Sequence, residues 1–296
     1  MKFKYKNIIY PIYLTVNPFL SPIKRLIFKF SSRRPFSIGY TPFKWQLIKE
    51  SIYSKEVLSD FRQNQIKKNF GIKFDERIVE YPWLFSQISN KKEFMLDAGS
   101  TFNFKVLLEH PTIQNKKLHI YTFYPENPSF PSKMVSYEYG DLRNLPYENG
   151  KFGLIVCHST IEHIDMDNSM YGYELQFNKD SQTKSYEYLK VISELIRVTQ
   201  KTGTILMTFP YGRFENHGFF QQFDKPMVDK MLEILKNYGK IELKYIIYEM
   251  TGWRFAANSE CNDAISHNPH SGAGKGVDGA AHSRCVCCLK FEKQFE

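Results

Sequence analysis

Short apolar runs alternate with stretches of helical periodicity along this 296-residue chain. The runs are predicted to be strands and cover 93–97, 117–122, 134–139, 152–158, 203–209, 241–249 and 284–291. The helical stretches between them cover 103–109, 185–199 and 225–237. Strands that alternate with helices favour a parallel sheet, because each crossover returns the chain to the same end of the sheet. We therefore predict an α/β fold with one central sheet and helices on both faces.

The residues before the first predicted strand differ in composition from the rest. They are basic and interrupted by proline, with a short amphipathic helix predicted at 23–30 and a longer helix at 44–68. Residues 1–49 contain ten of the 40 Lys and Arg residues and none of the 31 Asp and Glu residues. The net charge of +9 therefore belongs to this N-terminal part.

This basic segment is also rich in Phe, Tyr, Ile and Leu. Such a composition suits a membrane surface, where cations meet anionic headgroups and aromatic side chains lie at the interface. Peripheral membrane contact through residues 1–40 is therefore one hypothesis, and a basic arm without a partner is the simpler alternative. Nucleic acid is a less favoured partner, because its binding would require cations on the folded domain as well.

Composition limits the class of protein further. With 42% hydrophobic residues the chain can build a core, and it has no run of about 18 uncharged apolar residues that would predict a transmembrane helix. Pro11, Pro18 and Pro22 interrupt the first apolar run and argue against a signal peptide. Five cysteines in a chain this long do not make a secreted disulfide framework. The expected location is a reduced, cytoplasmic compartment.

Small and polar residues follow three of the predicted strands. Asp97-Ala-Gly99-Ser100 ends the first, Gly140-Asp141-Leu142 follows the third, and Ser159-Thr-Ile-Glu162-His163 follows the fourth. The carboxyl ends of parallel strands meet at one edge of a sheet, and ligands of open α/β folds bind there. Because Gly99 has no side chain, a ligand could approach the backbone of the first turn closely.

This ordered set of motifs resembles the core of class I S-adenosylmethionine-dependent methyltransferases, of the broad group called methyltransferase type 11. The resemblance covers residues 75–212 well and the rest loosely. It implies a Rossmann-like, mostly parallel sheet of seven strands whose last strand is antiparallel. It also implies a methyltransferase domain at 71–296 with insertions at 165–184 and 213–224, preceded by a basic extension at 1–70.

The resemblance places S-adenosylmethionine at the tips of the first strands. Asp97 would hold the amino acid end of the cofactor, beside the turn formed by Gly99 and Ser100. Thr122 stands where the family has an acidic residue that accepts both ribose hydroxyls, and one hydroxyl is a weaker acceptor than a carboxylate. The turn after Gly99 also lacks the further glycines of the family. These two departures favour the alternative of a non-catalytic binding module on the same fold.

The rest of the implied cofactor site follows the third and fourth strands. Asp141 would accept a hydrogen bond from the adenine amine, and the backbone N–H of Leu142 would meet a ring nitrogen. Ser159 would face the sulfonium and the methyl acceptor. Asp141 also has a simpler interpretation, as a residue that caps a helix in a turn.

Methyl transfer requires in-line positioning and, for an oxygen or nitrogen acceptor, a base. His163 is the first candidate for this base and His158 the second, because histidine titrates near neutral pH. Glu162 would orient either one. These residues could instead cap the next helix or contact the cofactor passively. A divalent ion bound by Glu162 with Asp165 and Asp167 is less favoured, and no metal is predicted.

Cys285, Cys287 and Cys288 lie close together near the end of the chain, with histidines upstream. Their spacing does not suit a zinc site, because tetrahedral sites favour two intervening residues. Alternation on a strand would also place Cys287 and Cys288 on opposite faces. We expect a buried final strand in which cysteine serves as a small apolar residue.

The predicted function is methyl transfer from S-adenosylmethionine to a small-molecule, lipid-linked or glycan acceptor. The non-catalytic binding module remains the alternative. A nicotinamide-dependent dehydrogenase would need G-x-G-x-x-G after the first strand, and the turn at Gly99 offers a single glycine.

Overall fold

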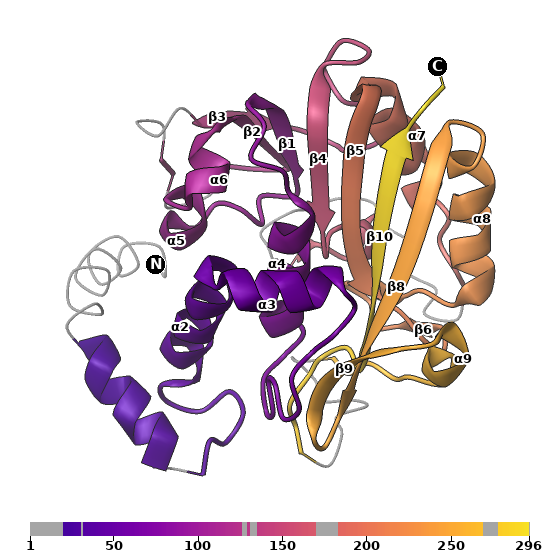
Figure 1. Ribbon diagram of the computed structural model, residues 1–296. Helices are drawn as coiled ribbons and strands as arrows, with labels where there is room; N and C mark the ends of the chain where they lie inside the picture. Colours follow the sequence, from indigo (N-terminus) through magenta and orange to yellow (C-terminus); the bar gives the residue numbers. More distant parts are fainter. Residues whose placement is uncertain are drawn as a thin grey trace, which may run out of the picture.

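The computed structural model describes residues 20–30, 32–125, 129–130, 135–169, 183–268 and 278–295. In these ranges the chain forms an eight-stranded sheet with the order β3-β2-β1-β4-β5-β10-β8-β9 (Figure 1). Its strands are β1 (Glu93–Ala98), β2 (Lys116–Thr122), β3 (Val135–Tyr139), β4 (Phe152–His158), β5 (Thr199–Pro210), β8 (Gly239–Glu249), β9 (Gly252–Ala256) and β10 (Cys285–Lys293). A short antiparallel pair is formed by β6 (Glu215–Asn216) and β7 (Gln221–Gln222).

The first five strands of the large sheet are parallel, and the last runs against them. β1 pairs with β2 and β4, β2 with β3, and β4 with β5, all in parallel. β10 is antiparallel to both β5 and β8. The structure thus confirms the predicted Rossmann-like sheet, including its antiparallel last strand. The strand order reverses between β1 and β4, and ligands of open α/β sheets bind at such a switch point.

The sheet has one strand more than the seven predicted. β9 forms a hairpin with β8, in which Tyr248 pairs with Trp253. The sequence does not predict this strand separately, because only Met250 and Thr251 lie between β8 and β9. The turn depends on Gly252, whose φ is 102° and where a Cβ would lie 2.4 Å from the carbonyl oxygen of Phe70. A side chain does not fit there.

Helices cover both faces of the sheet (Figure 1). They are α2 (Tyr40–Tyr53), α3 (Lys55–Arg62), α4 (Arg77–Gln87), α5 (Lys105–Leu108), α6 (Pro111–Gln114), α7 (Tyr188–Val198), α8 (Lys225–Leu235) and α9 (Asn258–Cys261), with a 3-10 turn η2 (Ile161–His163). α7 and α8 share one apolar core with Ile155 and Cys157 of β4. α2 and α4 share the other core with Leu154 and Val156. Alternate residues of β4 therefore enter opposite cores, as expected for a central strand.

The predicted helix at 44–68 is divided in two. α2 ends and α3 begins at Ser54, whose hydroxyl accepts a hydrogen bond from the backbone N–H of Val57. Serine is a preferred residue at this capping position, because its side chain satisfies an N–H group that the first turn of a helix leaves unpaired. The spacing of the apolar residues in this segment predicts a helix, but it does not predict that the helix is interrupted at Ser54.

Residues 20–30 form a further helix, and its Phe28 belongs to the same apolar core as Ile48 and Ile52 of α2. Phe28 is fully buried against the rings of Tyr40, Phe43 and Phe74. The contact is close, because a Cβ at Gly39 would lie 1.9 Å from the carbonyl oxygen of Lys24. This part of the N-terminal extension therefore packs tightly against the rest of the structure.

Asp75 joins the N-terminal helices to the start of α4. Its buried carboxylate accepts hydrogen bonds from Nζ of Lys44 at 2.6 Å and from the hydroxyl of Tyr40 at 2.9 Å. Burial alone would raise the pKa of Asp75, but the Lys44 ammonium outweighs burial and the pKa is lowered. The ion pair thus fixes the point where the chain enters α4.

Asp75→Asn should destabilise the protein, because the partly buried Lys44 ammonium would lose its counter-ion. Breaking such a pair costs about 3 kcal/mol. A lowered carboxyl pKa stabilises the folded state above the unfolded-state value, so the wild type should lose this contribution as the pH falls below the ordinary value of 3.8. The free energy of unfolding of the variant should not show this decrease at acid pH, because the variant has no carboxylate at position 75. Urea unfolding at neutral and acid pH measures both effects.

A matched control is Glu56→Gln, which removes a carboxylate from the exposed ion pair with Lys67. Exposed pairs contribute little to stability, so this variant should unfold at the same urea concentration as the wild type. An unchanged midpoint for Asp75→Asn would contradict the role given to Asp75.

Candidate functional site

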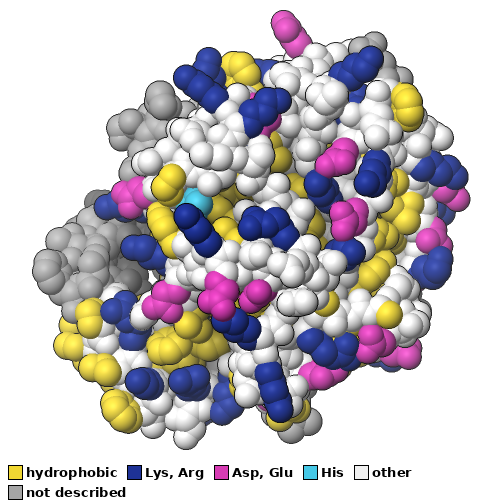
Figure 2. Space-filling view, in the orientation of Figure 1, with side chains coloured by type: hydrophobic (Ala, Val, Ile, Leu, Met, Phe, Trp, Pro, Cys, Tyr) yellow, Lys and Arg dark blue, Asp and Glu magenta, His cyan; other side chains and the backbone are white. Residues whose placement is uncertain are grey.

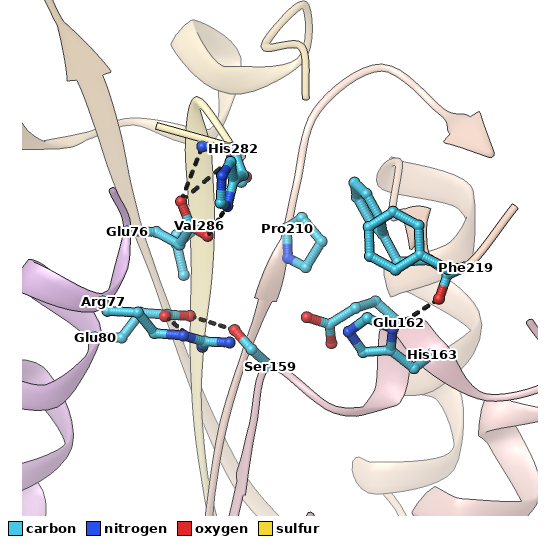
Figure 3. Close-up of a pocket in the computed structure, with 12 residues that line it drawn as sticks. Glu76, Arg77, Glu80, Ser159, Glu162, His163, Pro210, Phe219, His282 and Val286 are labelled. Atoms are coloured by element: carbon cyan, nitrogen blue, oxygen red, sulfur yellow. Dashed lines mark hydrogen bonds and ion pairs between the residues drawn. The ribbon is translucent and has the colours of Figure 1, made fainter. Parts of the chain in front are cut away.

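A cavity of about 210 Å³ lies at the carboxyl ends of β4 and β5 (Figure 3). Four segments line it: the start of α4, the turn after β4, the chain from the end of β5 to β7, and the chain that enters β10. The lining residues are Glu76, Arg77, Glu80, Ser159, Glu162, His163, Pro210, Phe219, Phe220, His282, Ser283 and Val286. Polar side chains from distant parts of the sequence therefore meet at the edge of the sheet where a ligand was predicted.

The carboxylate of Glu80 is the centre of a buried hydrogen-bond cluster. Its Oε2 accepts from Nη1 of Arg77 at 2.8 Å and lies 2.9 Å from Nε2 of His158, and its Oε1 accepts from the hydroxyl of Ser159 at 2.7 Å. Burial alone would raise the pKa of Glu80, but Arg77 and His158 outweigh it and hold the pKa well below its usual range. Glu80 is therefore a permanent charge that joins α4 to the end of β4.

His158, the second candidate base, does not line the cavity. It is fully buried, with its ring edge-on to Tyr81 at 4.6 Å and its Nε2 beside Arg77 and Glu80. Burial lowers its pKa, and the nearby Arg77 lowers it further. In the structure His158 supports the Glu80 cluster and has no access to an acceptor in the cavity.

Glu162 stands in the 3-10 turn after β4 and points into the cavity (Figure 3). Its side chain is buried, and its Oε2 has no hydrogen-bond partner among the described residues. Burial raises the pKa of Glu162 to about 8. A buried carboxyl group without a partner is costly in an apolar environment. Glu162 is therefore suited to bind a hydrogen-bond donor or to accept a proton near neutral pH.

His163, the first candidate base, also lines the cavity but has a different electrostatic environment. Nδ1 of His163 lies 2.7 Å from the carbonyl oxygen of Phe219, and this hydrogen bond favours the charged imidazole. Burial outweighs the hydrogen bond and lowers the pKa of His163 to about 4. The imidazole is therefore neutral at pH 7 and a weak proton acceptor. Since the pKa of Glu162 lies much closer to neutrality, Glu162 is the better base of the two.

Glu76 connects the cavity to the N-terminal segment. Its Oε2 accepts hydrogen bonds from the backbone N–H groups of His282 and Ser283 at 3.2 and 3.3 Å. Burial, together with the charges of Asp75 and Glu80, raises the pKa of Glu76 to about 7. The ring of Phe36 stacks on His282 with the centroids 4.7 Å apart. The N-terminal segment thus supports one wall of the cavity.

Sequence reasoning missed Glu76, Arg77 and Glu80. One signal was available for Glu80, which is an acidic residue inside the apolar stretch 78–85. A charge at such a position must find a buried partner when the stretch packs into a core. The partner itself could not be identified, because His158 lies 78 residues further along the chain.

Asp97 lies at the end of β1 as predicted, and its carboxylate binds its own turn. It accepts hydrogen bonds from the backbone N–H groups of Thr101 and Phe102 at 3.2 and 2.7 Å, and from the hydroxyl of Thr101 at 3.1 Å. The side chain is fully buried. Asp97 thus shapes the first strand-to-helix turn from beneath.

The turn after Asp97 is closely covered by the end of β4. Gly99 has a φ of 125°, and a Cβ there would lie 2.1 Å from the hydroxyl oxygen of Thr160. Ser100 follows with a φ of 65° and donates its hydroxyl to the carbonyl oxygen of Gly99 at 2.6 Å. The close approach that Gly99 permits is therefore made by Thr160 in this structure.

The remaining predicted cofactor residues lie at the ends of β2, β3 and β4. Arg143 binds the carboxylate of Asp141 through both Nε and Nη2, at 2.6 to 3.1 Å, and also binds Glu187. Thr122 ends β2, with its carbonyl oxygen accepting from the N–H of Gly140 at 3.0 Å. The side chain of Leu142 belongs to the apolar core, and Ser159 lines the cavity.

These residues fit a nucleoside cofactor by chemistry. Asp97 and Asp141 supply carboxylates, and Ser100 and Thr122 supply hydroxyls, all at neighbouring strand tips. The orphaned Oε2 of Glu162 adds a buried acceptor on the side of the cavity. Two contacts oppose binding, Thr160 over Gly99 and Arg143 on Asp141. A ligand in this place would have to displace both of them.

In the described ranges, no group of three or more His, Cys, Asp or Glu side chains is arranged to hold a metal ion. None of the helices in the same ranges combines the length and the hydropathy that crossing a bilayer requires. Residues 170–182 of the predicted insertion at 165–184, and residues 1–19 of the extension, lie outside the described part of the chain.

No protein-family model and no curated protein matches this sequence. Among solved structures, similarity is found to 1,6-didemethyltoxoflavin-N1-methyltransferase of Burkholderia thailandensis, with bound 1,6-didemethyltoxoflavin and S-adenosylhomocysteine. The identity is 11% and the TM-score 0.39, over 69% of this chain and 72% of that one.

Two further similar structures are N-methyltransferase NodS of Bradyrhizobium japonicum and a SAM-dependent methyltransferase of Methanosarcina mazei. NodS has 10% identity and a TM-score of 0.40, over 69% of this chain and 86% of that one. The Methanosarcina protein has 9% identity and a TM-score of 0.39, over 72% and 98%. Because these scores are low, the fold assignment depends on the strand order of the sheet itself.

Glu162→Gln should change how stability depends on pH. The pKa of Glu162 is about 8 in the folded protein and near 4.5 in an unfolded chain. The folded state therefore binds one proton more between these values, and this stabilisation is lost as the pH rises through 8. His163 has the opposite effect, but only below its ordinary pKa of 6.5. Between pH 6.5 and 8, the free energy of unfolding should fall with rising pH more steeply in the wild type than in the variant. The two slopes should differ by about 1.4 kcal/mol per pH unit.

Urea unfolding at several pH values measures this slope. Glu233→Gln, on the exposed face of α8, removes a carboxylate far from the cavity and serves as the control. It should keep the wild-type slope. Equal slopes for Glu162→Gln and the wild type would show that Glu162 is not protonated in the folded protein.

Proposed function

We propose that this chain is an S-adenosylmethionine-dependent methyltransferase that acts on a neutral, hydroxyl-bearing acceptor bound in the cavity. The observation that carries the proposal is the buried carboxyl group of Glu162, unpartnered at Oε2 among the described residues and directed into a cavity at the end of β4. The strand order and the polar residues at the tips of β1 to β4 support it.

The cofactor would be held by the residues at those strand tips. Asp97 and Ser100 would bind its amino acid end, Thr122 its ribose, and Asp141 with the backbone of Leu142 its adenine. When bound, S-adenosylmethionine supplies an electrophilic methyl group on a positively charged sulfur. Ser159 lies in the cavity lining, within a hydrogen bond of Glu80, and would form the boundary between the cofactor and the acceptor.

The charges around the cavity favour a neutral acceptor. Near neutral pH the cavity carries little net charge, because Arg77 and Glu80 form an ion pair and the pKa of Glu162 is raised to about 8 and that of Glu76 to about 7. A hydroxyl group can donate to Glu162 while it accepts from a donor such as Arg77. Phe219 and Phe220 supply apolar surface beside these groups, which suits the C–H face of a sugar ring. A hydroxyl of a small polyol or glycan is therefore the proposed acceptor.

Glu162 would act as the base. Its carboxylate would accept the proton of the acceptor hydroxyl, and that oxygen would take the methyl group supplied by bound S-adenosylmethionine, with S-adenosylhomocysteine as the leaving group once the carbon–sulfur bond is broken. With a pKa of about 8, Glu162 is both partly ionised and strong enough as a base near neutral pH. The permanent charge of Glu80 fixes Ser159 and Arg77 around the acceptor, and the neutral His163 holds the Phe219 backbone.

Transfer of labelled methyl groups to a panel of acceptors tests the proposed reaction. Neutral polyols and saccharides should be methylated, and amines and carboxylates should not. Glu162→Gln should lower kcat by about 100-fold or more, since a positioned base contributes at least this much. The wild-type rate should rise with pH toward a plateau above 8, and the variant should lack this rise. Wild-type turnover in Glu162→Gln, with Glu233→Gln as control, would contradict the assigned base.

Isothermal titration with S-adenosylmethionine tests the cofactor residues. Asp141→Ala should weaken binding about tenfold, because a hydrogen bond to a charged group contributes about 1.5 kcal/mol. Arg143→Gln should tighten binding, since Arg143 then no longer competes for the Asp141 carboxylate. If both variants bind like the wild type, Asp141 does not contact the cofactor.

A non-catalytic binding module is the second candidate. It is favoured by the contact of Thr160 over Gly99 and by the Asp141–Arg143 ion pair, since both involve residues that are predicted to bind the cofactor. The same titration separates the two functions. Absence of binding up to millimolar S-adenosylmethionine would favour the binding module, with the cavity as its ligand site.

A further inference from the structure

Helix 20–30 has two different faces. Phe28 is buried against the body of the protein, whereas Leu20, Ile23, Leu26, Ile27 and Phe30 are exposed. At 100° per residue these five side chains lie within an arc of about 120°, and Phe28 is on the opposite side. We call these five residues the apolar stripe. Phe30 is 81% exposed, so the stripe extends to the last turn of the helix.

Exposed apolar side chains also follow the helix in the sequence. Phe36 and Ile38 are also exposed large apolar side chains. Figure 2 shows hydrophobic and basic side chains next to one another at the lower left, where Figure 1 places this helix. A contiguous exposed apolar patch is uncommon on a protein without a partner and marks an interaction surface.

Basic residues border the stripe. Lys24 lies beside one edge of the stripe and Lys29 beside the other, whereas Arg25 lies on the opposite face of the helix, near Phe28. Lys24 and Arg25 also line a groove between this helix and α2, together with Lys49 and Lys105. Among the residues that line this groove, Glu109 is the one acidic residue. The sequence before the helix adds Lys2, Lys4 and Lys6.

We propose that the apolar stripe docks on an anionic membrane surface, with helix 20–30 lying in the plane of the headgroups. The stripe enters the boundary of the acyl chains, and the basic residues on both sides bind lipid phosphates. Charge complementarity selects this partner, since residues 1–49 contain no acidic residue. The proposal does not depend on methyl transfer.

Sedimentation of the full chain with lipid vesicles tests this proposal. The probes are vesicles of phosphatidylcholine alone and of phosphatidylcholine mixed with phosphatidylglycerol. The wild type should bind the anionic vesicles at least tenfold more tightly, and added salt should weaken this binding. Ile23→Asp with Phe30→Asp should lower binding at least tenfold. Both residues are exposed, so the double variant should keep the wild-type urea midpoint.

The matched control is Met250→Asp, which places the same charge on an exposed apolar residue in the turn between β8 and β9. It should bind vesicles like the wild type. Equal binding of the wild type and the double variant would overturn the proposal, as would failure of the wild type to bind either vesicle. A concentration-dependent dimer that is lost in the double variant would assign the stripe to a second copy of the chain and would also overturn it.

Discussion

The buried carboxylate of Glu80 holds the candidate site together. It joins α4 to the end of β4 by binding Arg77, His158 and Ser159. Without these partners a carboxylate at this depth would be protonated or would move to solvent. With them the charge stays in place, and Ser159 is held at a φ of 43°. The chain then turns so that Glu162 faces the cavity, and the floor of the cavity depends on this cluster.

The ionisable groups of the cavity have pKa values that are shifted in different directions. Burial outweighs the nearby charge of Arg77 and raises the pKa of Glu162, whereas Arg77 and His158 outweigh burial and lower that of Glu80. Environments that separate the pKa values of neighbouring acids give each a different role. Glu80 keeps its charge and positions its neighbours, and Glu162 can exchange a proton. Burial also shifts the pKa of His163, which it lowers to about 4.

Most of the sheet could be predicted from the sequence, because a buried strand is a local pattern. The run 284–291, for example, was predicted to be a buried strand and forms most of β10, with its cysteines in the core. The cavity could not be predicted, since Glu80 and His158 meet only when α4 packs beside β4. The preference for His163 as a base followed from its ordinary pKa, and burial at that position is not visible in sequence periodicity.

The stacking of Phe36 on His282 links the N-terminal segment to the cavity wall, because the backbone N–H of His282 also binds Glu76. Phe36 has a φ of 56°, a strained conformation for an aromatic residue that this packing maintains. A surface that alters this stacking would therefore also act on the backbone that binds Glu76 in the cavity wall. By thermodynamic reciprocity, if such a surface changes the affinity of the cavity for a ligand, the ligand changes the affinity of the segment for that surface by the same factor.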